Sequence, residues 1–248
     1  AMLVQAVRWI LGVVLAFFVA AASWAATVPV QYSLQLVLGE LPPYNCQDLT
    51  TTPRCINNKI AAKLAHYSGL EISVSLAPYA RALRILQQQQ TDLMIVLQNQ
   101  AVLAHADALQ ALYDVDLVLR LHHSASRLAP QDIRLGVLRG LDQDVYRLLP
   151  AYRYVELSDY EQGVEMLALG RLDAILAPAD ALTFLLQRHG AASQMMAEPQ
   201  LQVRQQVWLY CRKQACSAEQ QRQLQLAVQQ ILPHMPAILQ LMPMTYYQ

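Results

Sequence analysis

Apolar and polar positions follow one pattern twice in this chain, in residues 76–96 and again in residues 157–177. Each segment begins at the end of a predicted strand and continues through a short loop into a stretch with apolar residues at helical spacing. A turn and an aspartate follow, and then an apolar run that predicts the next strand. The aligned identical residues are Leu76 with Leu157, Tyr79 with Tyr160, Leu86 with Leu167 and Asp92 with Asp173. A repeat of this length is too long for a solenoid unit and predicts two similar α/β halves with a cleft between them.

Strand-like and helix-like segments alternate along the rest of the chain. Apolar runs predict strands over 31–38, 71–76, 92–97, 114–121, 133–138, 152–157, 173–176 and 202–211. Helical spacing predicts helices over 57–68, from Pro78, after Ser158, and over 179–189 and 218–232. Asn57 is the expected cap of the first helix, and Ser158 with Glu161 is the expected capping box of the third.

These elements predict an α/β fold class with two lobes, built from two mixed sheets flanked by helices. Residues 27–116 are expected to form most of the first lobe and residues 117–202 the second. Residues 203–248 are expected to return to the first lobe. The polar stretch 122–127 is the expected crossing between the lobes.

The N-terminal segment has the pattern of a signal peptide. Arg8 precedes an apolar run from Trp9 to Ala22, and Ser23 and Ala25 occupy the small-residue positions of a cleavage site. Residues 1–26 are therefore a predicted signal peptide, and the predicted location is the periplasm. An uncleaved membrane anchor remains the alternative, because weakly apolar residues continue to Val30.

The four cysteines form two local pairs. Zinc sites prefer closer thiolate spacing with histidines nearby, and neither pair has a neighbouring histidine. Disulfides are the favoured interpretation, and they agree with export to an oxidising compartment. The predicted disulfides join Cys46 with Cys55 and Cys211 with Cys216. No metal site and no cofactor is predicted.

Charge and motif content argue against several function classes. The 18 basic and 18 acidic residues give a formal net charge of zero, so nothing favours a nucleic-acid partner. Asp114 and Asp116 could be an acid/base pair, but alternating carboxylates in a strand more often face solvent. The sequence contains no nucleophile-elbow, zinc-protease or phosphate-loop motif. We therefore predict no catalytic residues and no enzymatic activity.

Four short motifs, taken in order, resemble one protein family. They are LPPY at 41–44, APYARAL followed by QTDLM between 77 and 94, LGVLRG at 135–140, and GRLDAIL at 170–176. Together they resemble the extracellular solute-binding proteins of family 3 over almost the whole chain after residue 26. The resemblance implies a type II periplasmic binding fold, in which a ligand is trapped when two lobes close. It also implies a small-molecule ligand and no catalysis. The predicted partner is a membrane transporter or sensor, and the predicted state is a monomer.

The sequence departs from that family at three ligand-binding positions. The family usually carries an Arg after the third strand that binds the ligand carboxylate, and residues 98–106 contain none. It usually carries an Asp after the last strand of the second lobe, where this chain has Pro178 and the nearest acid is Asp180. Leu141 replaces a common hydroxyl residue. Because a bidentate Arg–carboxylate pair supplies much of the affinity, its loss argues against ordinary α-amino-acid binding.

The candidate ligand-binding residues follow from loop positions at the ends of the predicted strands. Arg81 or Arg139 is expected to bind an anionic group, although Arg81 has an equal interpretation as a structural helix residue. Aromatic contacts are expected from tyrosines, of which the two repeat residues have a core-packing alternative. The remaining candidates, chosen by these criteria or by position, are Tyr44, Tyr79, Asn99, Tyr160 and Asp180.

The predicted function is that of a periplasmic solute-binding protein for a small polar or amino-acid-like ligand, serving an ABC-type uptake system. The alternative is a ligand-free interaction or sensory module of the same fold, motivated by the missing Arg and Asp. A third hypothesis, a dehydratase-like enzyme, would need a Glu or His in the cleft with a perturbed pKa.

Overall fold

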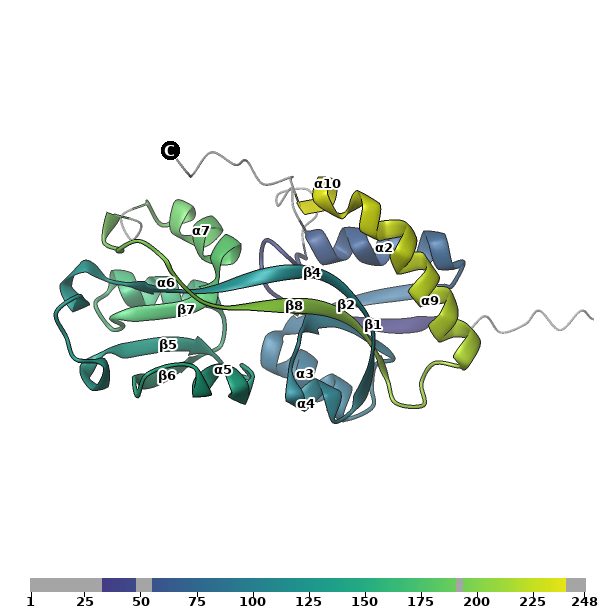
Figure 1. The fold of residues 1–248 in the computed structure, drawn as a ribbon, viewed down its shortest axis with the longest axis horizontal. Coiled ribbons are helices and arrows are strands. Elements are labelled where there is room, and N and C mark those ends of the chain that lie inside the picture. The colour runs from purple at the N-terminus through teal and green to yellow at the C-terminus, as the bar shows by residue number, and fades with distance from the viewer. Residues whose placement is uncertain (1–32, 48–54, 191–193, 240–248) are drawn as a thin grey trace, which may run out of the picture. The chain divides into compact units, whose positions relative to one another are not determined.

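The described residues of the computed structural model are 33–47, 55–190 and 194–239, so the predicted signal peptide lies outside them. Strands and helices alternate through most of this region, as the periodicity predicts (Figure 1). The strands are β1 (Leu34–Glu40), β2 (Ile72–Pro78), β3 (Leu93–Leu97), β4 (Ala106–Leu121), β5 (Arg134–Leu138), β6 (Arg153–Leu157), β7 (Ala174–Pro178) and β8 (Gln200–Arg212). The helices are α2 (Ile56–Ser68), α3 (Tyr79–Gln87), α4 (Gln100–Leu103), α5 (Gln143–Arg147), α6 (Tyr160–Ala168), α7 (Ala179–Arg188), α9 (Ala218–Ile231) and α10 (Met235–Leu239).

All described strands belong to one sheet, in the order β2-β1-β3-β8-β4-β7-β5-β6. Strand β1 pairs in parallel with β2 and β3, and β5 pairs in parallel with β6 and β7. The long strands β4 and β8 pair antiparallel with each other and join the two parallel sets. The α/β class and the two similar halves are confirmed, while the two expected sheets are continuous through β4 and β8. Below, the β2-β1-β3 set with its helices is the first half, and the β7-β5-β6 set with its helices is the second half.

Strand β4 is longer than the sequence pattern predicts. It has 16 residues, whereas the prediction began at Asp114. Register shifts interrupt its pairing with β8 between Ala108 and Gln110 and between Ala111 and Tyr113. Such bulges break the period of two that identifies a strand in a sequence. The expected crossing at 122–127 was also wrong, because β4 already pairs with β7 from Leu117 to Leu121.

Two helix caps differ from their predictions. Helix α2 begins after Cys55, and Asn57 lies inside its first turn with its side chain directed to other partners. Helix α6 is capped by Asp159, whose carboxylate accepts a hydrogen bond from the Gln162 backbone N–H at 2.7 Å. Gln162 Oε1 accepts from the backbone N–H of Ser158, the residue before the cap, so the expected capping box of Ser158 with Glu161 is not formed.

One apolar core cluster extends through both halves. It contains residues of α2, α3 and α9, which pack on the first half, and residues of α6 and α7 from the second half. Helices α2 and α9 pack side by side, as do α6 and α7 (Figure 1). A second cluster packs α5 against β5 and β7. Because the main cluster is shared, the two halves contribute to each other's burial.

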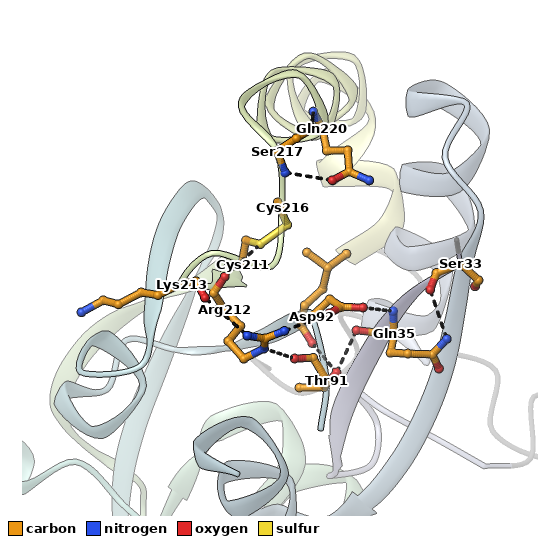
Figure 2. Close-up of polar contacts among 11 residues, drawn as sticks. Ser33, Gln35, Thr91, Asp92, Cys211, Arg212, Lys213, Cys216, Ser217 and Gln220 are labelled. Atoms are coloured by element: carbon orange, nitrogen blue, oxygen red, sulfur yellow. Dashed lines mark hydrogen bonds and ion pairs between the residues drawn. A yellow bond between two sulfur atoms is a disulfide. The ribbon is translucent and has the colours of Figure 1, made fainter. Parts of the chain in front are cut away.

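Both predicted disulfides are confirmed. The Cys46–Cys55 bridge closes the loop before α2, with Cα atoms 5.3 Å apart. The Cys211–Cys216 bridge closes the turn between β8 and α9, with Cα atoms 6.4 Å apart. Figure 2 shows the second bridge between Arg212 and the capping box of α9, in which Ser217 and Gln220 exchange hydrogen bonds.

The described helices include none of the length and apolar character needed to cross a membrane. The described residues also contain no group of three histidine, cysteine, aspartate or glutamate side chains placed to hold a metal ion.

Candidate functional site

The loop after β1 is held in place by a chain of amide hydrogen bonds. The Asn45 side chain donates to the Gly39 carbonyl at 2.6 Å, and the Asn57 side chain donates to Asn45 Oδ1 at 2.7 Å. The hydroxyl of Tyr113, from β4, donates to Asn57 Oδ1 at 2.8 Å. Asn45 and Asn57 are both buried, so these bonds satisfy groups that would otherwise be costly to bury. They fix the loop that carries Tyr44.

Tyr44 connects the two halves. Its ring stacks on Tyr113, with ring centroids 6.2 Å apart and planes inclined by 11°. Its hydroxyl donates to the carboxylate of Asp180 at 3.4 Å, and Asp180 lies in the first turn of α7. Burial, and then the charge of Asp180, raises the pKa of Tyr44 well above its ordinary value. Two candidate residues from distant parts of the sequence are therefore in contact.

The two repeat tyrosines occupy equivalent and equally buried positions. Tyr79 begins α3 and is 7% exposed, and Tyr160 begins α6 and is 3% exposed. Burial raises the pKa of Tyr79 to about 12, and a hydrogen bond with Asn99 offsets part of this rise. Burial also raises the pKa of Tyr160, and the neighbouring Tyr79 adds to that effect. Both side chains belong to the shared core cluster, which agrees with the core-packing alternative.

The loop after β5 packs directly on helix α3. Gly140 has a φ of +92°, a conformation that residues with a Cβ rarely adopt. A Cβ at this position would lie 2.8 Å from Leu83 Cδ1 and 3.4 Å from Tyr79 Cε1. The glycine therefore supplies both the turn and the close approach between the halves.

Three hydrogen bonds join this loop to the start of α4. The Asn99 side chain donates to the Gly140 carbonyl at 3.0 Å, while its Oδ1 accepts from the Ala101 N–H and caps α4. The Gln100 N–H donates to Asp142 Oδ2 at 3.0 Å. The Gln100 side chain donates to Asp144 Oδ2 at 3.4 Å. Side chains and backbone of the two halves thus bond to each other at the ends of β3 and β5.

Sequence reasoning missed two residues of this contact. Asp142 is 6% exposed, and its Oδ1 also accepts from the Asp144 N–H as the cap of α5. An acid at a helix cap after a parallel strand was the signal that could have identified it. Tyr210 of β8 is fully buried, and burial raises its pKa to about 12, with Tyr79 and Asp142 adding to the effect. Nothing in the local sequence distinguishes Tyr210 from an ordinary strand residue.

A small cavity lies beneath Tyr44. Its volume is about 30 Å³, which leaves room for roughly one or two water molecules. Its polar lining consists of the side chains described above, and the rest is apolar. The lining residues with polar side chains are Tyr44, Asn45, Asn57, Tyr79 and Tyr113. The protein's own side chains fill most of the space at this junction.

A larger hollow lies between α3, the start of α4 and the loop after β5. Its volume is about 320 Å³. Arg139 lines it and forms an ion pair with Glu156 at 3.2 Å, in which both side chains are more than half exposed. Arg81 is exposed on α3 and lines neither space. The structure thus brings Tyr44, Tyr79, Asn99, Tyr160 and Asp180 to the contact between the halves, places Arg139 at its edge, and leaves Arg81 apart.

No protein-family model matches this sequence, and no curated protein matches it by sequence. Solved structures match the fold. A histidine kinase sensor domain with similarity to periplasmic binding proteins has a TM-score of 0.72 at 13% identity, covering 85% of this chain and 95% of that one. A mutant of ArgBP from T. maritima has a TM-score of 0.70 at 12% identity, covering 84% and 93%. The amino acid ABC transporter substrate-binding protein AbpA from Streptococcus pneumoniae, bound to L-arginine, has a TM-score of 0.67 at 16% identity, covering 84% and 93%. The chain therefore has the fold of the type II periplasmic binding proteins.

Proposed function

We propose that this chain is a periplasmic solute-binding protein that captures a small polar or amino-acid-like molecule between its two halves and serves an ABC-type uptake system. The observation that carries the proposal is the direct contact between the loops after β1, β3, β5 and β7. In open α/β sheets, ligands bind outside the carboxyl ends of parallel strands, which is where these four loops lie. The fold shared with a transporter's substrate-binding protein supports the same function.

The geometry supports a mechanism of opening and closing. Strands β4 and β8 are the paired strands that run from one half into the other, so bending them separates the halves without breaking either parallel set. Closure brings Tyr44 to Asp180 and Asn99 to Gly140. A ligand that contacts both halves would shift the population toward the closed state by its differential affinity for that state.

We retain Tyr44, Tyr79, Asn99, Arg139, Tyr160 and Asp180 as the proposed ligand contacts. In the closed contact the Tyr44 hydroxyl bonds to Asp180 and the Asn99 side chain bonds to the Gly140 carbonyl. Ligand binding would therefore exchange these bonds for bonds to the ligand. Arg81 belongs to the proposed contacts only if α3 presents that side chain when the halves open.

A thermal-shift screen against amino acids, amines, small carboxylates and sugars tests the function. A ligand that binds only the folded protein, at 100 times its Kd, adds about 2.7 kcal/mol of stability. We expect a clear rise in melting temperature with one chemical class. A folded protein that responds to no compound would contradict solute binding.

A sensory or interaction module is the second candidate, and one observation favours it. The cavity of about 30 Å³ beneath Tyr44 is smaller than small-molecule pockets, which span roughly 300–1,000 Å³. The similar histidine kinase sensor domain agrees with this candidate. Retention of the protein by a membrane partner, together with a thermal-shift screen in which no compound binds, would favour the sensory or interaction module over transport.

We further propose that residues 1–26 are removed on export, and that the mature protein is a monomer without catalytic activity. N-terminal sequencing of protein from the periplasmic fraction tests the cleavage, since an intact N-terminus in the membrane fraction would identify an anchor. Light scattering of the purified protein tests the monomeric state.

A further inference from the structure

The hollow beside α3 has the dimensions of a ligand site, unlike the small cavity beneath Tyr44. Its volume of about 320 Å³ falls within the range of small-molecule pockets, roughly 300–1,000 Å³. One wall is α3 with the start of α4, and the other is the loop from Arg139 to Gln143. The two walls come from opposite halves, so a molecule in this hollow would contact both.

Each wall carries one arginine. Arg84 lies on α3, is exposed, and its side chain forms no hydrogen bond or ion pair with a described residue. Arg139 lies on the opposite wall and pairs with Glu156. That pair is exposed to solvent on both sides, and such pairs contribute little to stability. Both guanidinium groups are therefore able to bind an anion at small cost.

The acidic group that lines the hollow is already occupied. Asp142 Oδ2 accepts from the Gln100 N–H, and Asp142 Oδ1 accepts from the Asp144 N–H. Asp142 is thus the one carboxylate among the residues that line the hollow, each of its oxygens already accepts a backbone hydrogen bond, and two arginines line the same space. Its other polar side chains are neutral amides, which can donate hydrogen bonds to an anion. These amides belong to Gln87, Asn99, Gln100 and Gln143.

We propose that this hollow binds a small dicarboxylate, with one carboxylate at Arg84 and the other at Arg139. Two cations on opposite walls match two anionic groups, and two arginines against one carboxylate that already accepts two backbone hydrogen bonds favour a dicarboxylate over an α-amino acid. The inference rests on the proposed function, because the ligand lies between the halves, and it adds the ligand class and the location. A bound dicarboxylate would also hold the two walls together.

Calorimetric titration of the purified protein with succinate and glutarate tests the proposal, with L-glutamate and inorganic phosphate as comparisons. We expect saturable binding of a dicarboxylate. L-Glutamate is expected to bind at least about tenfold more weakly, because its ammonium would be partly desolvated and would compete with two backbone N–H groups for Asp142. Phosphate is expected to bind weakly, because a compact ion contacts one wall. Tighter binding of L-glutamate or phosphate would overturn the dicarboxylate assignment.

Matched arginine variants locate the site. Arg84→Gln and Arg139→Gln are each expected to weaken dicarboxylate binding by about tenfold to a hundredfold, the usual effect of losing a charge-assisted hydrogen bond. Arg153→Gln is the control, since Arg153 is an exposed arginine of β6 that lines neither space. Melting curves without ligand establish that each variant is folded.

The outcomes separate the two proposals. Dicarboxylate binding that survives both substitutions would overturn this site. Binding of a neutral amino acid, unaffected by either substitution, would support solute binding in general and overturn the inference. A folded protein that binds no compound of the wider screen would overturn both.

Discussion

The two repeat units use the same aspartate in different surroundings. Asp92 precedes β3, and its Oδ2 accepts from the Gln35 N–H of β1 at 2.9 Å. Asp173 precedes β7, and its Oδ2 accepts from the Arg134 N–H of β5, also at 2.9 Å. Each carboxylate therefore ties the start of one strand to the strand beside it. This bond explains why the aspartate occurs in both copies.

The arginine that binds each aspartate comes from a different place. In the second half, Arg134 binds Asp173 through two nitrogens, at 2.8 and 2.9 Å, and the arginine lies on the neighbouring strand. In the first half, Arg212 reaches Asp92 at 3.4 Å from the end of β8 and donates to the Thr91 carbonyl at 2.8 Å (Figure 2). In the second half the aspartate is thus bound by an arginine of the same half. In the first half the aspartate is bound by an arginine that follows the whole second half in the chain.

The largest effect is expected from substitutions that leave a cavity in the apolar core shared by both repeats. Leu86 and Leu167 are aligned, and each is 1% exposed within the same cluster. Leu86→Ala and Leu167→Ala should each lower the free energy of unfolding by about 2–5 kcal/mol. Because the cluster is continuous, chemical denaturation followed by circular dichroism should show one cooperative transition for both variants. Two transitions, each moved by one substitution, would show that the halves unfold independently.

An intermediate effect is expected from the disulfide at the end of β8. Replacing Cys211 and Cys216 with alanine should lower the free energy of unfolding by about 2 kcal/mol, the loop-closure value for a short turn. The second half has no such bridge, since all four cysteines belong to the first half and its return segment. Denaturation with and without reductant measures the effect, and the Cys46–Cys55 bridge remains in the variant as an internal control. An unchanged midpoint would mean that Arg212 is positioned without the bridge.

The smallest effect is expected from the ion pair between Arg134 and Asp173 in the second half. Hydrogen bonds from Arg134 hold the pKa of Asp173 below its ordinary value, so the folded protein binds this proton more weakly than the unfolded chain does. The resulting stability is present above about pH 4 and is lost as the pH falls through the folded-state pKa. Asp173→Asn should cost about 1 kcal/mol at neutral pH, because the Arg134 side chain is 37% exposed and solvent screens the pair. It should also make the free energy of unfolding less dependent on pH below 4. An acid dependence equal to that of the wild type would assign the effect to other carboxylates.

The sequence predicted the features that depend on local periodicity. The repeat of Tyr79 and Tyr160, the succession of strands along the chain and the disulfide pairs all follow from local sequence patterns. The first part of β4 was missed because its bulges disturb the alternation. The filled junction was missed for another reason: bonds such as Asn99 to Gly140 join segments whose distance is set by the whole fold. Local patterns placed these residues near the strand ends without showing that they bond to each other.

The position of β8 in the sheet has a consequence for how the protein is made. Strand β3 pairs with β1 on one side and with β8 on the other, and β8 ends at Arg212. During synthesis from the N-terminus, the edge of β3 therefore stays unpaired until nearly all of the second half has emerged. An unpaired strand edge is prone to association with other chains. Until β8 forms, β3 therefore presents an edge at which another chain can pair, and the Cys211–Cys216 bridge follows directly on the strand that covers this edge.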